Sequence, residues 1–542
     1  MPGSDKLWSR RDFVGTLGGA GLITALPGAL RSAVLPDSET IRISILHTTD
    51  LHGHILPTTG YDGAPDVGGL ARCVTQIHRW RRQNPNHLLI DVGDVYQGTD
   101  VALRTRGALM IDLFNHLKFD AWIIGNHEFD WGMDPFVRAL ENSSMPVLAA
   151  NMSMAGRRAG TITETANPFS KVKPYILKEI AGIKIAIIGI TTPGMPFWFR
   201  PDFIRDLHFD HPNDAVREAI AAARRSGADA VILAGHMGLK QRGGGDDFAN
   251  NVIALTTEFS ELPVFIAGHT HQLIPGRLVN NVLITQADHF GIHVGRVDLT
   301  FDRASKRLIG REAMCERMDN RVHLNHVVLS RAKPHLDVSD AALAEPVGEL
   351  LHAIRVKATA GEPSDAEMLI GTAIREALAE RGILIDGVFH GLFDTSRDIP
   401  AGPKTVADIW NILPYENFLV TAELKEEELR AMMDEMYTAQ EPRSLIGFDV
   451  RTSGSGTHRK VTSVVPKVRP GRTQGERYAI ALNTFDSRSA GHRFMQLRDM
   501  LDRPEARCVL HDVQTRDALI ELFRRHGKIG REIWNRTLSA AA

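Results

Sequence analysis

Seven side chains with nitrogen or oxygen donor atoms recur in one pattern through the first half of the chain. Each lies in a turn or beside a glycine, one to several residues after an apolar run that is typical of a buried strand. The seven residues follow five separate strands, so a chance placement of unrelated polar residues at loop ends is a poor explanation of the pattern. Carboxylate and imidazole donors without a thiolate suit zinc, manganese, iron or cobalt. The seven residues are Asp50, His52, Asp94, Asn126, His236, His269 and His271.

This donor set is too large for one ion and suits two. Two close cations need a negative charge between them, and Asp94 is the candidate for the shared ligand. Paired ions about 3.5–4 Å apart hold the attacking and leaving oxygens of a displacement and bring the pKa of bound water toward about 7. The set therefore predicts hydrolysis at phosphorus. The first ion would bind Asp50, His52, Asp94 and His271, and the second would bind Asp94, Asn126, His236 and His269.

His127 is left over once these ligands are assigned, and it directly follows Asn126. An imidazole gives or takes a proton near neutral pH. We expect His127 to protonate the leaving oxygen or to stabilise charge on the phosphoryl group. Asp130 is the nearest carboxylate in the sequence and could hold the ring in the useful tautomer. A histidine that only supports the structure is the alternative.

The elements that must position these side chains alternate between strands and helices. This alternation predicts an α/β layered core, in which ligands bind beyond the carboxyl ends of the strands. The strands expected before the ligands are Ile41–Ile45, His87–Val92, Ala121–Ile124, Ala230–Leu233 and Val264–Ile266. Helices are expected over Ala108–Leu117 and Asn213–Arg225.

Length and charge limit the remaining possibilities. The chain has 542 residues and a formal net charge of -2, so it is too long for one ordinary core and does not resemble a polyanion-binding protein. The sequence has no stripe of Lys and Arg residues with interleaved aromatics, so it does not predict a nucleic-acid polymer as partner. No stretch is long and apolar enough for a stable membrane span. The three cysteines have no zinc-type spacing.

The N-terminal region, residues 1–40, is typical of an export signal. Arg10 and Arg11 are adjacent, Phe13 follows two places later, and a Gly- and Ala-rich apolar run comes next. This order predicts a twin-arginine signal and a periplasmic or secreted protein. An N-terminal helix with two adjacent arginines is the alternative.

The ligand blocks resemble those of calcineurin-like metallophosphoesterases, and the flanking segments Leu46–Gly53 and Gly68–Arg72 resemble the bacterial exported 5'-nucleotidase group. That group includes UDP-sugar hydrolases and 2',3'-cyclic-nucleotide phosphodiesterases. The resemblance implies two divalent ions (Mn, Zn or Co) and the ligand and histidine roles given above. It implies a two-sheet α/β sandwich over residues 41–330, a linker helix over 331–357, and a smaller α+β substrate-binding domain over 358–542.

In the C-terminal domain, the resemblance implies a nucleobase held between two aromatic rings, here Tyr415 and Phe485. The family also has Gly-Gly-x-Arg, whose arginine binds phosphate. This chain has Leu-Phe-Asp-Thr-Ser-Arg instead, so Arg397 stands one place off as the predicted phosphate contact. The family's Gly-Gly-Asp-Gly-aromatic block is replaced by Ser489–Phe494. These departures weaken the prediction of nucleoside monophosphate specificity.

The expected function is that of an exported dinuclear-metal phosphoesterase acting on phosphate esters of nucleotides. On the same scaffold, the alternatives are a 2',3'-cyclic phosphodiesterase, a UDP-sugar hydrolase or a sugar-phosphate phosphatase. A sulfur-oxidation thiohydrolase is disfavoured because that pattern lacks a histidine in the place of His127. A non-catalytic exported metal-binding protein is the alternative from another class. The oligomeric state is not predicted.

Overall fold

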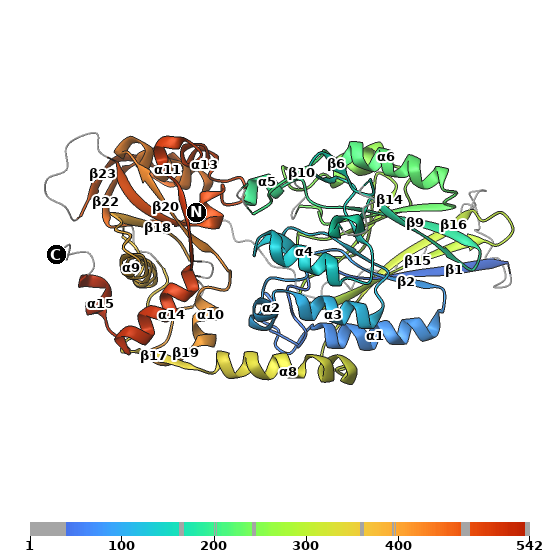
Figure 1. Ribbon diagram of the computed structural model, residues 1–542, viewed down its shortest axis with the longest axis horizontal. Helices are drawn as coiled ribbons and strands as arrows, with labels where there is room; N and C mark the ends of the chain where they lie inside the picture. Colours follow the sequence, from blue (N-terminus) through green and yellow to red (C-terminus); the bar gives the residue numbers. More distant parts are fainter. Residues whose placement is uncertain are drawn as a thin grey trace, which may run out of the picture.

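The computed structural model describes residues 39–161, 167–199, 201, 203–240, 245–357, 362–392, 395, 397–467 and 477–536. Two α/β bodies lie side by side, and helix α8 (His326–Leu343) runs along one edge to join them (Figure 1). The twin-arginine segment of the predicted signal lies outside the described residues. The predicted two-sheet sandwich with a smaller α+β domain is confirmed.

The first sheet of the larger, N-terminal domain has seven strands in the order β16-β15-β1-β2-β3-β4-β7. Strands β1 to β4 and β7 pair in parallel, so their carboxyl ends share one edge of the sheet, whereas β15 and β16 are antiparallel. The seven strands are β1 (Thr40–Thr48), β2 (His87–Asp91), β3 (Ala121–Ile123), β4 (Val147–Leu148), β7 (Val172–Lys173), β15 (His293–Asp302) and β16 (Leu308–Arg317).

The second sheet of this domain has six strands in the order β13-β14-β12-β11-β9-β8. Its central strands β9, β11, β12 and β14 pair in parallel. The six strands are β8 (Tyr175–Ile180), β9 (Ile183–Ile190), β11 (Ala230–Gly235), β12 (Val264–Ala267), β13 (Leu273–Val279) and β14 (Val282–Ala287). A small sheet of β5 (Met152–Met154), β6 (Arg157–Arg158) and β10 (Leu207–Phe209) lies beside them.

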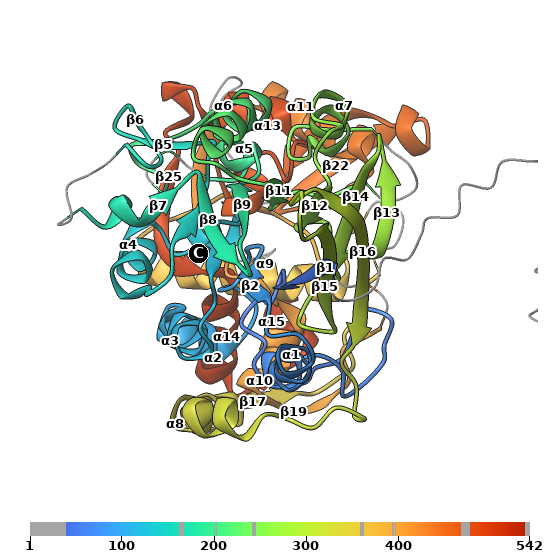
Figure 2. The same cartoon turned by 90° about the vertical axis from the view of Figure 1, so that its right-hand side faces the viewer.

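The two sheets pack face to face, and helices cover the outer faces (Figure 2). Ile43 and Ile45 of β1 share one buried cluster with Ile187 of β9 and Ile232 of β11, which is the interior of the sandwich. Burying such side chains stabilises the fold by about 1.5–3 kcal/mol each. The covering helices are α1 (Leu70–Gln83), α2 (Asp100–Thr105), α3 (Ala108–Leu117) and α4 (Met133–Asn142) on one side, and α6 (Pro212–Arg225) and α7 (Val252–Glu258) on the other.

The C-terminal domain is built on a five-stranded sheet in the order β21-β18-β24-β20-β25. Alternate residues face opposite sides, since Ala481 belongs to the cluster under α9 and α14, and Ile480 and Leu482 belong to that under α11 and α13. The strands are β18 (Gly387–His390), β20 (Phe418–Leu424), β21 (Ser444–Ile446), β24 (Tyr478–Asn483) and β25 (Val509–Gln514), and the helices are α9 (Asp365–Glu380), α11 (Glu426–Ala439), α13 (Met495–Leu501) and α14 (Thr515–His526).

Shorter elements complete the structure, and two of them face the domain boundary. Helix α5 (Met195–Trp198) extends from the N-terminal domain toward the C-terminal domain (Figure 1), and α12 (Thr484–Ser487) follows β24. The others are β17 (Pro346–Leu350), β19 (Gly402–Thr405), β22 (Phe448–Ser453), β23 (Lys460–Pro466), β26 (Lys528–Ile529), α10 (Val406–Ile412) and α15 (Arg531–Arg536). The predicted linker over residues 331–357 contains most of α8 and all of β17.

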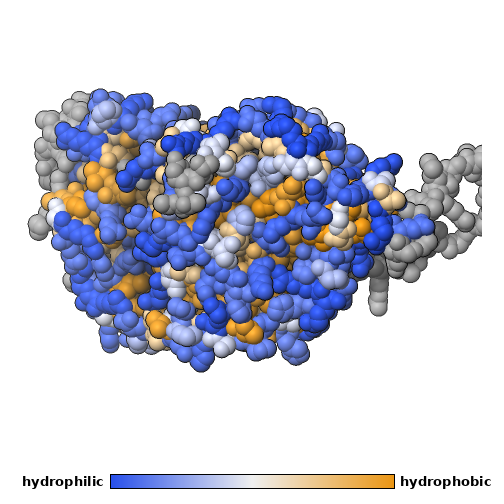
Figure 3. Space-filling view, turned by 45° about the vertical axis from the view of Figure 1, so that its right-hand side comes forward, coloured by the Kyte–Doolittle hydropathy of each residue, from blue (hydrophilic) through white to orange (hydrophobic). Residues whose placement is uncertain are grey.

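The surface drawn in Figure 3 is largely hydrophilic, with apolar residues visible in separate patches. Among the residues that the structure describes, no helix has both the length and the apolar character needed to cross a bilayer.

Candidate functional site

All seven predicted ligands follow the carboxyl ends of strands. β1 is followed by Asp50 and His52, β2 by Asp94, and β3 by Asn126; in the second sheet, β11 is followed by His236, and β12 by His269 and His271. Five of the seven, namely Asp50, His52, Asp94, His269 and His271, have φ between 48° and 71°. This left-handed conformation costs a non-glycine residue about 1–3 kcal/mol, and such residues cluster at functional sites.

Gly93 allows the loops of the two sheets to meet. Its φ is 92°, and a Cβ atom here would lie 2.6 Å from the backbone nitrogen of Gly125 and 2.7 Å from Nδ1 of His236. A side chain at this position would therefore push apart the loops after β2, β3 and β11. The glycine beside Asp94 is needed for close approach as well as for the turn.

The first group of donors consists of Asp50, His52, Asp94 and His271, with one donor atom of each within 4.8 Å of all the others. The Nε2 atoms of His52 and His271 are 3.0 Å apart. Nε2 of His271 lies 3.4 Å from Oδ1 of Asp50, and Nε2 of His52 lies 3.8 Å from Oδ2 of Asp94. Four donors thus converge on one point at the boundary of the two sheets.

The second group shares Asp94 with the first. Donor atoms of Asp94, His236 and His269 lie within 4.8 Å of one another, and Nε2 of His236 is 3.0 Å from Oδ2 of Asp94. Asn126 is also buried, and its Oδ1 atom has no hydrogen-bond partner among the described residues. The structure therefore places the predicted shared carboxylate between the two groups.

These residues fit divalent metal ions. A buried polar atom without a partner destabilises a protein by about 1–3 kcal/mol, and Oδ1 of Asn126 lacks a hydrogen-bond partner among the described residues. Burial lowers the pKa of His269 to about 4 and holds the pKa of His52 well below its usual value. Neutral imidazole is the form that binds a metal. A cation in the second group would satisfy this buried oxygen.

Backbone carbonyls fix the orientation of the ligand rings. Nδ1 of His52 lies 2.8 Å from the carbonyl oxygen of Gln97, and Nδ1 of His236 lies 2.6 Å from that of Val92. Such contacts leave Nε2 of each ring directed at the metal position and fix its tautomer.

Glu128 has a structural role that the sequence did not reveal. Its buried carboxylate accepts hydrogen bonds from the backbone N–H groups of Asp94, Val95 and Gly125, at 3.2, 2.8 and 2.6 Å. It therefore ties the loop after β2 to the loop after β3. Burial and the neighbouring Asp94 raise the pKa of Glu128 to about 7. The position of Glu128 within the Gly125–Asp130 block was the feature of the sequence from which this role could have been predicted.

His127 and Asp130 are paired as the sequence predicts. Nδ1 of His127 lies 2.6 Å from Oδ2 of Asp130, and Nε2 lies 3.9 Å from Oδ2 of Asp94. Burial lowers the pKa of His127, but the carboxylates of Asp130 and Asp94 outweigh it and raise the pKa to about 10. A bound cation opposes this rise. The imidazole is held at one nitrogen and can deliver a proton from the other.

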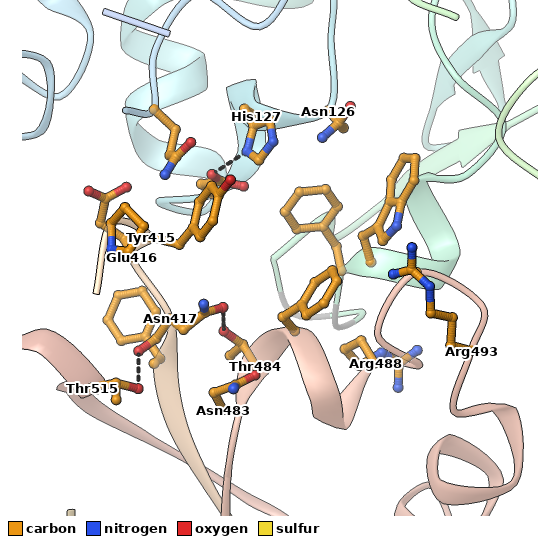
Figure 4. Close-up of a pocket in the computed structure, with 18 of the residues that line it drawn as sticks. Asn126, His127, Tyr415, Glu416, Asn417, Asn483, Thr484, Arg488, Arg493 and Thr515 are labelled. Carbon is orange, nitrogen blue, oxygen red and sulfur yellow. Dashed lines mark hydrogen bonds and ion pairs between the residues drawn. The ribbon is translucent and has the colours of Figure 1, made fainter. Parts of the chain in front are cut away.

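A cavity of about 710 Å³ lies between the two domains. Figure 4 shows Asn126 and His127 on its N-terminal side, with Tyr415, Asn417 and Thr484 facing them from the C-terminal domain. Its volume is within the range of small-molecule sites. The catalytic candidates thus open onto a space large enough for a substrate.

The predicted substrate contacts have different positions. Tyr415 and Phe485 both line the cavity. Arg397 is exposed and is not among the described residues that line the cavity. Arg443 and Arg493 line the cavity instead. Sequence reasoning missed both, because they belong to other loops than the family's phosphate-binding arginine.

The family model that matches is that of the calcineurin-like phosphoesterases, over residues 43–273. Human 5'-nucleotidase is 29% identical over 300 residues, which cover 51% of this chain and 49% of the human protein. Endonuclease YhcR of Bacillus subtilis is 24% identical over 486 residues, which cover 85% of this chain and 38% of that protein. The chain thus spans about half the length of these curated relatives or less.

Two solved structures share the fold across both domains. The 5'-nucleotidase precursor of Thermus thermophilus has a TM-score of 0.68 at 21% identity, covering 90% of this chain and 97% of its own. The sulfate thiohydrolase SoxB of Thermus thermophilus has a TM-score of 0.62 at 16% identity, covering 90% and 94%. The chain therefore carries a calcineurin-like phosphoesterase domain and shares the two-domain fold of the Thermus 5'-nucleotidase precursor.

Proposed function

We propose that the protein is a dinuclear-metal phosphoesterase that hydrolyses phosphate esters of nucleotides. The observation that carries the proposal is the position of Asp94, which belongs to both donor groups and lies 3.9 Å from Nε2 of His127. A shared carboxylate, two groups of metal-binding donors and a proton donor are the components of a two-metal site for hydrolysis at phosphorus.

The residues of the chain have distinct roles in this reaction. Bound divalent ions supply a hydrolytic nucleophile at neutral pH and neutralise charge on the phosphoryl group. Asp94 and the histidines of each group would hold these ions beside the strand ends. As the ester bond breaks, the proton on Nε2 of His127 passes to the leaving oxygen, while Asp130 holds Nδ1 and stabilises the ring.

The nucleotide part of the proposal rests on the cavity and on the relatives. Tyr415 and Phe485 of the C-terminal domain and Trp198 of α5 present aromatic rings to the cavity. Stacking of a base on an aromatic side chain contributes about 1–3 kcal/mol. Several curated relatives are named 5'-nucleotidases.

A cyclic-nucleotide phosphodiesterase activity is the second candidate. A relative from Salmonella typhimurium, 26% identical over 303 residues, is named 2',3'-cyclic-nucleotide 2'-phosphodiesterase/3'-nucleotidase. Protonation of a ribose oxygen by His127 serves both reactions.

Release of inorganic phosphate and of nucleoside tests these candidates. The protein, stripped with a chelator and reloaded with Mn, Zn or Co, is assayed on 5'-nucleotides, 3'-nucleotides, 2',3'-cyclic nucleotides, UDP-sugars and sugar phosphates. We expect metal-dependent turnover of nucleotides by the wild type. The variant Asp94→Asn is the control, and we expect it to be inactive. Turnover of none of them by the metal-loaded protein contradicts the proposal and favours a non-catalytic metal-binding protein.

We also propose export through residues 1–40. Fusing this segment to a reporter that is active only outside the cytoplasm tests the proposal, with the paired substitution Arg10→Lys and Arg11→Lys as the matched control. Export of the wild-type fusion and retention of the paired variant are expected, and export of both contradicts a twin-arginine signal.

A further inference from the structure

Two consecutive residues of the C-terminal domain, Tyr415 and Glu416, lie against the N-terminal domain beside the first donor group. We propose that they are positioning residues for the metal ion of that group, and that each acts through one residue of the N-terminal domain. Glu416 acts through Gln97 on His52, and Tyr415 acts through Tyr61 on His271. This inference rests on the two-metal site of the proposed function and adds that the C-terminal domain helps to build one half of it.

The first connection runs from Glu416 to His52. Glu416 and Gln97 both line the cavity between the domains, and the Gln97 side chain lies near the Glu416 carboxylate. The carbonyl oxygen of Gln97 lies 2.8 Å from Nδ1 of His52. Gln97 is only 2% exposed, so it has little freedom to move independently of either partner. Glu416 therefore bears on the residue that orients a metal ligand.

The C-terminal domain holds Glu416 rigidly. Its Oε1 accepts a hydrogen bond from Nη1 of Arg516 at 3.1 Å. Nε of Arg516 donates to the carbonyl oxygen of Leu413 at 2.8 Å, and the guanidinium carbon lies 3.3 Å from the centre of the Trp410 ring. Arg516 is 1% exposed. A buried ion pair contributes little to stability, but it fixes the position of the carboxylate that faces Gln97.

The second connection runs from Tyr415 to His271. The side chains of Tyr415 and Tyr61 lie close together across the domain boundary. The ring of Tyr61 stacks on that of His289, with centroids 4.2 Å apart, and His289 stacks on His271, with centroids 5.0 Å apart. Tyr61 is 59% exposed, so this ring is held by its contacts with neighbours rather than by burial in a core.

The second donor group is supported differently. His236 is oriented by the carbonyl oxygen of Val92, within the N-terminal domain. Loss of the Tyr415 or Glu416 contacts should therefore weaken one metal site and spare the other. Removing a group that orients a metal ligand typically lowers metal affinity about 10–100-fold.

Metal titration of the full-length protein tests the inference without relying on turnover. Metal-free wild type, Tyr61→Phe, Glu416→Gln and the double variant are titrated with Co²⁺ and followed by calorimetry and by the visible absorption of bound cobalt. Tyr175→Phe is the matched control, because its hydroxyl bonds to Ser226 on the surface. Circular dichroism shows whether each variant folds. If Glu416→Gln does not fold, Tyr61→Phe still tests the inference.

The expected result is that one of two binding steps weakens about 10–100-fold in Tyr61→Phe and Glu416→Gln, while the other step and the control match the wild type. A His271→Ala variant identifies the step that belongs to the first group. If the wild type binds two ions and both variants bind them equally tightly, or if both steps weaken alike, the inference is overturned and the proposed function stands. A wild type that binds no pair of ions overturns the proposed function as well.

Discussion

Replacing His127 by alanine distinguishes the two roles that an imidazole at this position can have. If His127 protonates the leaving oxygen, the variant should fail most with substrates whose leaving oxygen is strongly basic. General acid catalysis contributes about 10²–10⁴-fold, which corresponds to about 3–5 kcal/mol of transition-state stabilisation. The structure supports a full effect, because Nδ1 is held 2.6 Å from Asp130 and Nε2 lies 3.9 Å from Asp94.

The assay compares kcat/KM for a nucleoside 5'-monophosphate with that for p-nitrophenyl phosphate, whose phenolate leaves without protonation. We expect His127→Ala to lose about 10²–10⁴-fold on the nucleotide and much less on the p-nitrophenyl ester. His208→Ala, an exposed histidine of β10, is the control. Equal losses on both substrates would refute proton donation and assign His127 to stabilising charge on the phosphoryl group. Unchanged rates on both substrates would show that His127 has no role in the reaction.

Three further perturbations follow from the same geometry. Asp94→Asn should reduce bound metal below two equivalents by elemental analysis and lower turnover by orders of magnitude, since the shared charge is lost; full metal content contradicts this. Asp130→Asn should lower the pKa of His127 from about 10 in the metal-free protein, as seen by NMR. Because the pKa of His127 is raised above 6.5, its pairing with Asp130 stabilises the metal-free protein fully below pH 6.5, and this stabilisation is lost as pH rises toward about 10. The free energy of unfolding should therefore change less with pH in the variant than in the wild type across this range. Phe485→Ala should raise KM for nucleotides by the loss of about 1–3 kcal/mol of stacking and leave KM for glycerol phosphate unchanged; equal effects refute a base contact.

The predicted ligands lie together in the structure for a reason that was accessible from the sequence. Asp50, Asp94 and Asn126 each follow one of three parallel strands of the first sheet, so their strand ends share an edge. His236 and His269 follow strands of the second sheet, which packs against the first. Strand periodicity and order along the chain are enough to place such residues, because parallel pairing leaves few choices.

The substrate contacts were harder to predict because they depend on how two domains meet. Arg397 was selected because it stands one place away from the arginine of a family motif, but Arg397 is exposed and Arg443 lines the cavity. The guanidinium of Arg443 is directed by Asp486, 3.1 Å away and 43 positions later in the chain. Likewise, no pattern around Tyr61 indicates that it touches Tyr415. Contacts between distant loops carry no periodic signal.

The left-handed backbone at five ligands has a consequence for the choice of residue. His271 has a φ of 51°, and its side chain is 25% exposed. Glycine adopts this conformation freely, so His271→Gly relieves about 1–2 kcal/mol of backbone strain and leaves no deep void behind. Backbone strain alone would therefore favour glycine at this position. The histidine is explained by the donor atom that its imidazole brings to the first group rather than by the fold of the loop.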